Sequence, residues 1–448
     1  MGCQNSVIGF ALNLMDHRQL MARPFYTLFF LLLLPIIFLR MLWRSRLAPA
    51  YRKRWLERLG IFASRPKPEG LWMHSVSVGE TIAIAPLVKR IQHRYPDLPI
   101  TITTTTPTGS DQVEAQFGDS VFHVYAPYDI PGFLGNFLRR IQPKMCIIME
   151  TELWPNTVAQ CAGNGIPVLV ANARLSERSA KGYGKFSALT APMLKELSLV
   201  AVQNKVDGDR FCALGLPKDR LQVTGSIKFD LQIPADLIER AVKMRANWGA
   251  TARPVVIAAS THEGEDQLVL QAFSKLQQNV KNPLLVLVPR HPERFDKVAE
   301  MCTSSQFTLA RRSRDEAVDE NTQILLGDTM GELLLFYGVS DAAFVGGSLV
   351  SVGGHNPLEP AALNVPIFTG PHYFNFQDIV DQLAAVGGAA LVSTPSELAE
   401  GWCRVLQQTS VRDAMQAAAA EIVIRNRGSL DRLEQLVVAQ WLLLSGNN

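Results

Sequence analysis

The feature of this sequence that most constrains its fold is a regular alternation of short apolar runs with helical patterns. In the first half, apolar runs are separated by helical stretches such as Thr81–His93 and Pro131–Ile141. The apolar runs lie at Leu71–Val76, Ile100–Thr105, Val121–Tyr125, Met145–Met149, Val168–Ala171, Leu199–Val202 and Gln222–Thr224. This alternation predicts an α/β fold with a doubly wound parallel sheet.

The same alternation occurs a second time after a polar helical stretch at Ile233–Arg253. The second set of runs lies at Pro254–Ala259, Leu284–Val288, Phe307–Leu309, Ile324–Leu326, Ala342–Val345, Ile367–Thr369 and Ala390–Val392. A chain of 448 residues is long enough for two such domains. We therefore expect two Rossmann-like domains, over residues 46–230 and 251–405, joined by a linker over residues 231–250. Helices over residues 406–448 are expected to pack back on the first domain.

The N-terminus differs from ordinary soluble sequence. The stretch Phe25–Leu39 carries no charge and is followed by a basic cluster that includes Arg44, Arg46 and Lys53. An apolar segment with basic residues beyond it is typical of a membrane anchor with a cytoplasmic flank. We predict an anchor over residues 23–45, preceded by a leader of uncertain structure over residues 1–22. A cleaved signal peptide and a buried core helix remain alternatives, and the sequence leaves open whether the anchor spans the bilayer or lies on it.

Charge and cysteine usage exclude some classes of protein. The formal net charge is +3, from 44 basic and 41 acidic residues, a balance that does not favour binding to nucleic acid. The six cysteines are scattered singly without a Cys-x-x-Cys spacing. Neither a zinc site nor a redox pair is indicated, and a reducing, cytoplasmic setting fits best.

Acidic residues follow two strands of the first predicted sheet. In "HSVSVGE", Glu80 comes after a strand and a glycine, at the start of a helix. It could complement the helix dipole or act as a general base, and its position alone does not decide between them. In "METELWPN", Glu150 and Glu152 follow the strand expected at Met145–Met149. One of these two acids can serve as a cap while the other is functional.

Basic residues later in the first half suit an anionic ligand. Arg174 and Arg178 occupy the loop after the strand at Val168–Ala171, where a solvated basic loop is the plain alternative. Lys228, in "GSIKFD", closes the first half, where a lysine can neutralise a phosphate. The Asp207-Gly208-Asp209 sequence resembles a metal–nucleotide motif, but helix capping is the better interpretation of it.

Residues of the second half suggest a nucleotide site at the carboxyl ends of its strands. Arg290 follows the strand at Leu284–Val288 and is suited to a phosphate contact. Gly331 and Glu332 stand at a predicted helix start, whose N–H groups suit an anion. In "GGHNPLEPA", Glu359 is placed to accept hydrogen bonds from the hydroxyls of a ribose.

Seven of these segments together resemble one enzyme family. In chain order they are "HSVSVGE", "METELWPN", "NARLSERS", "GSIKFD", "PRHPERF", "GDTMGEL" and "GGHNPLEPA". They are similar to motifs of the Kdo transferases of lipopolysaccharide biosynthesis, where Kdo is 3-deoxy-D-manno-octulosonic acid. The resemblance covers the chain from about Arg23 onward, and the leader over residues 1–22 has no counterpart in it.

The resemblance implies a GT-B glycosyltransferase, with an acceptor domain and a CMP-sugar donor domain facing one another across a cleft. It implies an inverting transfer of Kdo from CMP-Kdo to lipid IVA that releases CMP and needs no metal or other cofactor. Glu80 matches the proton acceptor of the family, and Glu150 and Lys228 match its transition-state stabilisers. The positions that match its CMP-binding segments are Pro289, Arg290, Met330, Gly331, Glu332, Asn356, Pro357, Leu358 and Glu359.

The resemblance also implies a location and an acceptor contact. We expect a bacterial inner-membrane protein with one N-terminal anchor and its catalytic domains on the cytoplasmic face. Arg174 and Arg178 are candidates for contacts with the phosphates of the lipid acceptor. The alternatives are another membrane-associated GT-B transferase with a different nucleotide sugar and lipid, a tethered nucleotide-binding protein without catalysis, and a GT-B-like epimerase.

Overall fold

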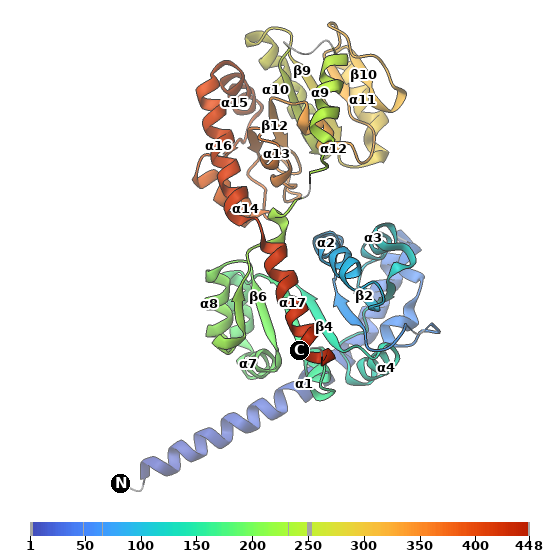
Figure 1. The fold of residues 1–448 in the computed structure, drawn as a ribbon, viewed down its shortest axis with the longest axis vertical. Coiled ribbons are helices and arrows are strands. Elements are labelled where there is room, and N and C mark those ends of the chain that lie inside the picture. Colours follow the sequence, from blue (N-terminus) through green and yellow to red (C-terminus); the bar gives the residue numbers. More distant parts are fainter. Residues whose placement is uncertain (1–2, 48, 65, 232, 249–252, 447–448) are drawn as a thin grey trace. The chain divides into compact units, whose positions relative to one another are not determined.

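The computed structural model describes residues 3–47, 49–64, 66–231, 233–248 and 253–446. The chain divides into two compact units (Figure 1). Unit 1 comprises Met1–Ile227 and Gly428–Asn448, and unit 2 comprises Lys228–Arg427. Each unit is built around its own parallel sheet, as the repeated alternation in the sequence predicts.

The described part of unit 1 contains a seven-stranded sheet in the order β3-β2-β1-β4-β5-β6-β7. Every neighbouring pair in this sheet is parallel. The strands are β1 (Leu71–His74), β2 (Ile100–Thr104), β3 (Phe122–Tyr125), β4 (Met145–Met149), β5 (Val168–Ala173), β6 (Leu199–Val202) and β7 (Leu221–Val223). The strand order reverses direction between β1 and β4. In open α/β sheets, ligands bind at the carboxyl ends of the strands beside such a reversal.

Helices cover both faces of the sheet in unit 1. They are α2 (Val78–Arg94), α3 (Pro107–Phe117), α4 (Pro131–Ile141), α5 (Pro155–Gly163), α6 (Glu177–Lys185), α7 (Ser187–Glu196), α8 (Lys205–Ala213) and α17 (Ser429–Ser445). Side chains of α2, α3 and α17 pack on one face, and those of α4, α5, α7 and α8 pack on the other. The strands are apolar on both faces because each face packs against helices. In β1, for example, Met73 faces the first core and Trp72 faces the second.

The described part of unit 2 has the same plan, with the strand order β10-β11-β9-β8-β12-β13-β14. Its strands are β8 (Val255–Thr261), β9 (Leu284–Pro289), β10 (Leu309–Arg311), β11 (Ile324–Leu326), β12 (Ala342–Val345), β13 (Ile367–Thr369) and β14 (Ala389–Leu391). Its helices are α9 (Leu237–Asn247), α10 (Glu265–Asn279), α11 (Phe295–Ser304), α12 (Leu333–Gly338), α13 (Leu358–Ala362), α14 (Gln377–Ala385), α15 (Pro395–Gln407) and α16 (Thr409–Asn426). The prediction of two doubly wound parallel sheets is therefore confirmed.

The segment that the sequence suggested as a linker, residues 231–250, contributes to unit 2 instead of merely joining two domains. Helix α9 buries Leu237 and Ala241 in a core that it shares with α12. Arg245 in the same helix forms an ion pair with Asp341, with 2.8 Å between Nη2 and Oδ2. A short apolar face and one arginine are enough to dock a helix whose remaining surface is polar.

The C-terminal helices also divide differently from the predicted boundary at residues 405 and 406. Helix α16 remains in unit 2, and only α17 returns to unit 1, where it packs against α2. Arg90 in α2 bonds to Asp431 and lies 3.2 Å from Glu434 in α17. Gly225 lies so close to Ser429 that any Cβ at this position would overlap the serine hydroxyl, and its φ is +85°. The glycine of "GSIKFD" is therefore required by the return of α17.

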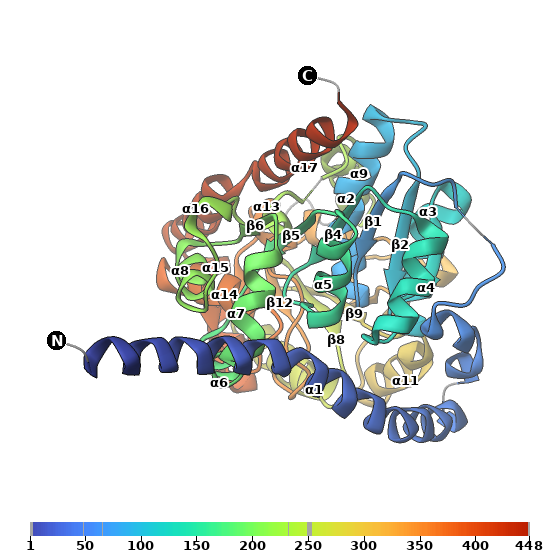
Figure 2. The ribbon, with the colours of Figure 1, turned by 90° about the horizontal axis from the view of Figure 1, so that it is seen from below.

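Helix α1 (Cys3–Leu47) covers both the predicted leader and the predicted anchor. Figure 2 shows α1 running along unit 1 past α7, and α1 contacts both α7 and α5. Its segment Met21–Arg46 is long and apolar enough to cross a membrane, and an 18-residue window within it has a mean hydropathy of 2.3. Residues 1 and 2 of the predicted leader lie outside the described residues.

Candidate functional site

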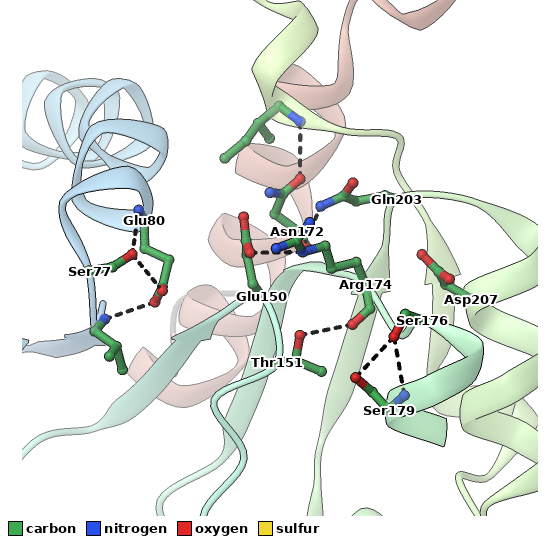
Figure 3. Close-up of polar contacts among 12 residues, drawn as sticks. Ser77, Glu80, Glu150, Thr151, Asn172, Arg174, Ser176, Ser179, Gln203 and Asp207 are labelled. Atoms are coloured by element: carbon green, nitrogen blue, oxygen red, sulfur yellow. Dashed lines mark hydrogen bonds and ion pairs between the residues drawn. The ribbon is translucent and has the colours of Figure 1, made fainter. Parts of the chain in front are cut away.

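The carboxyl ends of β1, β4 and β5 bring three of the predicted residues of unit 1 to one edge of its sheet (Figure 3). Glu80 stands in the first turn of α2 after β1, Glu150 follows β4, and Arg174 follows β5. Because these strands are neighbours and parallel, their carboxyl ends lie together. The topology therefore gathers residues that are far apart in the chain.

Glu80 is held by a cap at the start of α2. Ser77 is the N-cap residue, and its Oγ accepts a hydrogen bond from the backbone N–H of Glu80 at 3.3 Å. The same hydroxyl donates to Oε1 of Glu80 at 2.8 Å, and the N–H of Val76 donates to Oε2 at 2.8 Å. The side chain thus has the reciprocal bonding of a capping box, shifted by one residue. Glu80 therefore has a structural role at the helix start, which the sequence left open as an alternative to a role as general base.

The protonation behaviour of Glu80 goes beyond that of a simple cap. The residue is only 8% exposed. Burial raises the pKa of Glu80 to about 7; the hydrogen bonds from Val76 and Ser77 oppose this rise, and the charges of Glu150 and Glu152 add to it. A carboxylate that changes protonation state near neutral pH is suited to take up a proton during a reaction.

Glu150 adopts a backbone conformation that is rare for a residue with a side chain. Its φ is +54°, and its N–H pairs with the carbonyl of Ala171 in β5. Its carboxylate accepts from Arg174, with 3.0 Å between Oε2 and Nε. Left-handed conformations outside glycine are uncommon and concentrate at functional sites. Arg174 is therefore bound to an acid of the site, whereas Arg178 is exposed on α6.

Asn172 is a residue of this edge that the sequence motifs did not single out. It is fully buried, has a φ of +53°, and accepts at Oδ1 from the backbone N–H of Ile227 at 3.2 Å. Its Nδ2 has no hydrogen-bond partner among the residues that the structure describes. The hydrogen bond from Ile227 to Asn172 fixes the backbone directly before Lys228. The only available signal for Asn172 was its place inside "NARLSERS".

Asp207 and Asp209 point to different partners. Asp207 binds Asn204, the N-cap of α8, and Arg210 at 2.9 Å, while Asp209 pairs with Lys205 at 2.8 Å. Capping accounts for Asp207, as the sequence suggested. Within the described part of the chain, no three His, Cys, Asp or Glu side chains are grouped as ligands for a metal ion.

Unit 2 contains a pocket of about 270 Å³. Residues that follow β9, β11 and β12 line it, including those shortly before the short helices α12 and α13. Its lining includes Pro289, Arg290, Met330, Gly331, Asn356 and Glu359, six of the nine positions expected to bind the donor. Polar and aromatic side chains also line it, at Ser260, Thr329, Tyr337, His355 and Phe376. The motifs that suggested a nucleotide site are therefore neighbours in space.

The other three expected donor positions have different surroundings. The carboxylate of Glu332 is bonded to Arg312 at 2.8 Å and to Thr329 at 2.5 Å. Leu358 packs in the hydrophobic core of unit 2, and Pro357 is the buried residue that precedes α13. These three residues are therefore not among those that line the pocket.

Glu359 is the acid that lines the pocket, and it is partly buried. Its Oε1 accepts from Nδ2 of Asn356 at 3.3 Å. Burial raises the pKa of Glu359 to about 7, against the opposing effects of Asn356 and Arg290. Lys228 lies next to the same pocket, because its Nζ stands 5.7 Å from the ring centre of Phe376. The pocket thus combines a carboxylate that can accept from hydroxyls with two cations that suit a phosphate.

Glu265 organises the glycine-rich loop beside this pocket, and sequence reasoning missed it. The residue is fully buried in the first turn of α10. Its carboxylate accepts from the backbone N–H groups of Gly347 at 2.6 Å, Ser348 at 2.9 Å and Leu349 at 2.8 Å. A buried carboxylate that receives several backbone N–H groups is strongly stabilised in place. Nothing in the sequence marks this long-range contact.

Three histidines adjoin the pocket and were also missed. Nε2 of His262 lies 2.8 Å from Nε2 of His355, and the ring of His291 stands edge-on to His262 at 5.1 Å. Burial, together with the charges of His262 and Arg290, lowers the pKa of His355 to about 3. One imidazole must therefore donate and the other accept while both are neutral.

Comparisons with known proteins are consistent across the chain. Residues 53–231 match the family described as 3-deoxy-D-manno-octulosonic-acid transferase (kdotransferase). The 3-deoxy-D-manno-octulosonic acid transferase of Haemophilus influenzae is 47% identical over 420 residues, covering 93% of this chain and 98% of the relative. The transferase of the same description from Bordetella pertussis is 37% identical over 434 residues, covering 92% and 99%.

A solved structure extends the comparison to the fold. UDP-GlcNAc 2-epimerase from Neisseria meningitidis, bound to UDP-GlcNAc, has a TM-score of 0.53 and 14% identity to this chain. The match covers 84% of this chain and 99% of the epimerase. At this identity the likeness concerns the fold alone, and it confirms the expected GT-B class.

Proposed function

Since this chain belongs to the 3-deoxy-D-manno-octulosonic acid transferase family and is therefore a glycosyltransferase, we propose that its donor is CMP-Kdo and its acceptor is lipid IVA. The reaction is an inverting, metal-independent transfer of Kdo to a sugar hydroxyl of the acceptor, with release of CMP. The observation that carries this proposal is the meeting of six expected donor positions around one pocket in unit 2.

The pocket supports a nucleotide donor by its chemistry. Glu359 is partly buried and bonded to Asn356, so its carboxylate is oriented to accept from the ribose hydroxyls. Arg290 is exposed at the pocket, where its guanidinium can bind the phosphate of CMP. Lys228 adds a second positive charge beside Phe376. As CMP leaves, negative charge grows on the phosphate oxygen, and these two cations stabilise it.

Glu80 is assigned as the general base. A sugar hydroxyl is a weak nucleophile, so a positioned carboxylate has to take its proton as the hydroxyl attacks. The pKa of about 7 lets Glu80 be ionised before the attack and still accept the proton during it. Direct attack by the activated hydroxyl is a single displacement, which inverts the configuration at the sugar carbon.

Glu150 is assigned to the stabilisation of the transition state. Transfer of a sugar passes through a state with positive charge on the ring, which a fixed carboxylate stabilises. Arg174 holds the carboxylate of Glu150 in one orientation through its 3.0 Å contact. Arg174 therefore supports the site from within, and Arg178, which is exposed on α6, is the better candidate for a phosphate of the lipid acceptor.

The location follows from the acceptor. A lipid that carries sugars and phosphates stays at a membrane surface, so the enzyme has to reach it there. The apolar segment Met21–Arg46 of α1 supports attachment of unit 1 to that surface. We place the protein at the bacterial inner membrane, with the two catalytic units on the cytoplasmic face.

The test is the incubation of the full chain with CMP-Kdo and lipid IVA, followed by mass analysis of the lipid product. The proposal predicts a Kdo-containing lipid and an equivalent amount of CMP, both in buffer and in excess chelator. Parallel reactions contain UDP-sugars in place of CMP-Kdo. Product from a UDP-sugar but not from CMP-Kdo would contradict the assigned donor, and loss of activity in chelator that magnesium restores would contradict the metal-independent mechanism.

A further inference from the structure

Helix α1 has two different faces between residues 21 and 46. One face is partly or fully buried against the rest of unit 1, at Tyr26, Thr27, Phe30, Leu33, Leu34, Ile37, Phe38, Met41 and Ser45. The opposite face is exposed and consists of large apolar side chains at Phe25, Phe29, Leu32, Ile36, Leu39 and Trp43. The exposed series advances by three or four residues, and the docked series repeats at the same interval with some adjacent pairs, which is the spacing of stripes along a helix. The apolar segment is therefore divided lengthwise between protein and surroundings.

Contacts with unit 1 begin at the N-terminal end of this segment. Arg23 lies 3.8 Å from Glu196 in α7. Asn156 in α5 donates from Nδ2 to the hydroxyl of Thr27 at 2.9 Å. Asn156 itself is fastened to Asp129, which accepts its backbone N–H at 3.0 Å. The first turns of the segment therefore rest on polar and charged groups of the catalytic unit.

The contacts continue through the middle of the segment to its C-terminal end. The ring of Phe30 packs against Tyr128 and Trp154, with ring centres 6.4 Å and 6.3 Å apart. Phe38 packs against Tyr128 and Trp55 at 5.9 Å and 5.6 Å.

The end of the segment is fastened as well. The hydroxyl of Tyr128 donates to Sδ of Met41 at 2.8 Å. Ser45 accepts from Nε of Arg52 at 3.0 Å. Docking is therefore continuous from Arg23 to Ser45.

This continuous docking conflicts with a helix that crosses a bilayer. At 1.5 Å per residue, the distance from Arg23 to Ser45 is roughly 33 Å, about the thickness of the hydrocarbon core. A crossing helix would carry Glu196, Asp129 and the polar end of α5 into that core along with it. Charged groups inside the hydrocarbon are strongly unfavourable unless they are paired within a bundle.

We propose that α1 lies flat in the membrane surface and does not span the bilayer. The exposed stripe Phe25–Trp43 enters the boundary between headgroups and acyl chains, and the docked face carries unit 1 on the cytoplasmic side. This inference deepens the membrane attachment in the proposed function and rests on it for the identity of the surface. It does not depend on which sugar is transferred.

An anionic lipid surface fits the charges along the exposed side of α1. Arg40, Arg44 and Arg46 are exposed at its C-terminal end, and Arg23 is exposed at its N-terminal end. The guanidinium of Arg44 stands over the ring of Tyr51 at 4.8 Å, which holds the cation beside the stripe. Basic side chains beside an apolar stripe are attracted to an anionic membrane surface. A second protein copy would not require this flanking charge.

The flat arrangement also suits the reaction. Asp129 caps α5 through the N–H groups of Asn156 and Thr157, at 3.0 Å and 2.7 Å, so the α1 contact reaches the structure that carries the site. Helix α5 follows directly on the segment after Glu150. A membrane helix docked along its length therefore fixes the height of unit 1 above the lipid acceptor, whereas a helix attached at one end would not.

The depth of labelled positions in the bilayer tests the proposal. Full-length variants Phe25→Cys, Leu32→Cys and Leu39→Cys are labelled with a fluorophore and bound to phosphatidylethanolamine–phosphatidylglycerol vesicles. Peptide mass analysis identifies the labelled positions, and the unmodified chain, in which Cys212 and Cys403 are partly exposed, is labelled in parallel and gives the background. Lipids brominated at different chain depths then quench the fluorophores. We expect the three positions to be quenched at one common, shallow depth.

A matched position on the docked face completes the test. Leu33→Cys lies next to Leu32 but faces unit 1, so its label should be quenched several-fold less than that at residue 32. A spanning helix would instead place residue 32 deepest, with residues 25 and 39 near opposite surfaces, and would overturn the proposal. Absence of quenching at all four positions would also overturn it, because another protein copy would then cover the stripe. Kdo transfer is measured on the same samples, so a shallow common depth without transfer would count against the proposed function alone.

Discussion

Ser77 and Glu80 bind each other twice, through a backbone N–H that donates to the serine hydroxyl and through that hydroxyl, which donates to the carboxylate at 2.8 Å. The first bond caps the N-terminus of α2, and the second stabilises the ionised form of Glu80. One pair of side chains thus joins helix capping to the chemistry proposed for the site. Substitutions can separate these two effects, because stability and the pH dependence of activity report on them independently.

Ser77→Ala should shift the pH profile of Kdo transfer toward higher pH. The Ser77 hydroxyl stabilises the ionised carboxylate, so its removal raises the pKa of Glu80 further above about 7. The base must be ionised to act, and activity at low pH falls accordingly. Ser176→Ala is the matched control, because Ser176 caps α6 by accepting from Ser179 at 3.1 Å. Both variants should lose about 1 kcal/mol of stability, and an unchanged profile for Ser77→Ala would contradict the assignment.

Arg290→Ala and Glu359→Gln should weaken binding of the donor. Both side chains line the pocket of unit 2, and each is expected to make a charge-assisted hydrogen bond to CMP. Loss of such a bond raises the KM for CMP-Kdo by roughly 10- to 100-fold. Steady-state kinetics with each substrate varied in turn measures the effect. Equal increases in KM for donor and acceptor would argue against the donor site, and Arg314→Ala, an exposed arginine of the same unit, should change neither.

Glu265→Gln should loosen the glycine-rich loop of unit 2. The amide would turn a donor toward backbone N–H groups of Gly347, Ser348 and Leu349 that now bind a carboxylate. We expect a loss of about 2–4 kcal/mol in the stability of this region. Hydrogen exchange of the loop amides measures it directly. Glu263→Gln is the control, since Glu263 is exposed and pairs only with exposed Lys297 in the described structure; equal protection in both variants would refute the role of Glu265.

Gly225→Ala should detach or shift α17. An alanine at this position is strained by the φ of +85°, and its Cβ would overlap Ser429. We expect a loss of about 1–3 kcal/mol and faster cleavage between residues 427 and 446 in limited proteolysis. Gly182→Ala provides the comparison, because a Cβ there meets no atom within 4 Å and should leave the cleavage rate unchanged. An intact α17 in Gly225→Ala would show that the close approach is not required.

Much of the fold could be predicted because it depends on local pattern. The apolar run expected at Leu284–Val288 is found as β9 at Leu284–Pro289, since a strand buried on both faces has few polar residues to blur its ends. Helix α9 was expected as part of a polar helical stretch but was assigned to a linker, because only a narrow face, including Leu237 and Ala241, is apolar. Its docking depends on the distant Asp341, which no local pattern reveals.

The candidate site was predictable where its residues follow strands, and not where they act through distant contacts. Glu80 and Glu150 could be found because the carboxyl end of a parallel strand is a position with chemical meaning. Glu265 and Asn172 could not, since each acts on backbone N–H groups far away in the sequence. Similarly, the pairing of His262 with His355 exists only once β8 and the loop after β12 are neighbours.

The rate of Kdo transfer by Glu80→Gln tests the central assignment most directly. Glutamine keeps the size of the side chain but cannot accept the proton, so the single-turnover rate with CMP-Kdo and lipid IVA should fall by roughly 10²- to 10⁴-fold. Its thermal unfolding and its affinity for CMP should stay close to those of the unmodified chain. A variant that folds, binds CMP and transfers Kdo at the unmodified rate would contradict the assignment of Glu80 as the base.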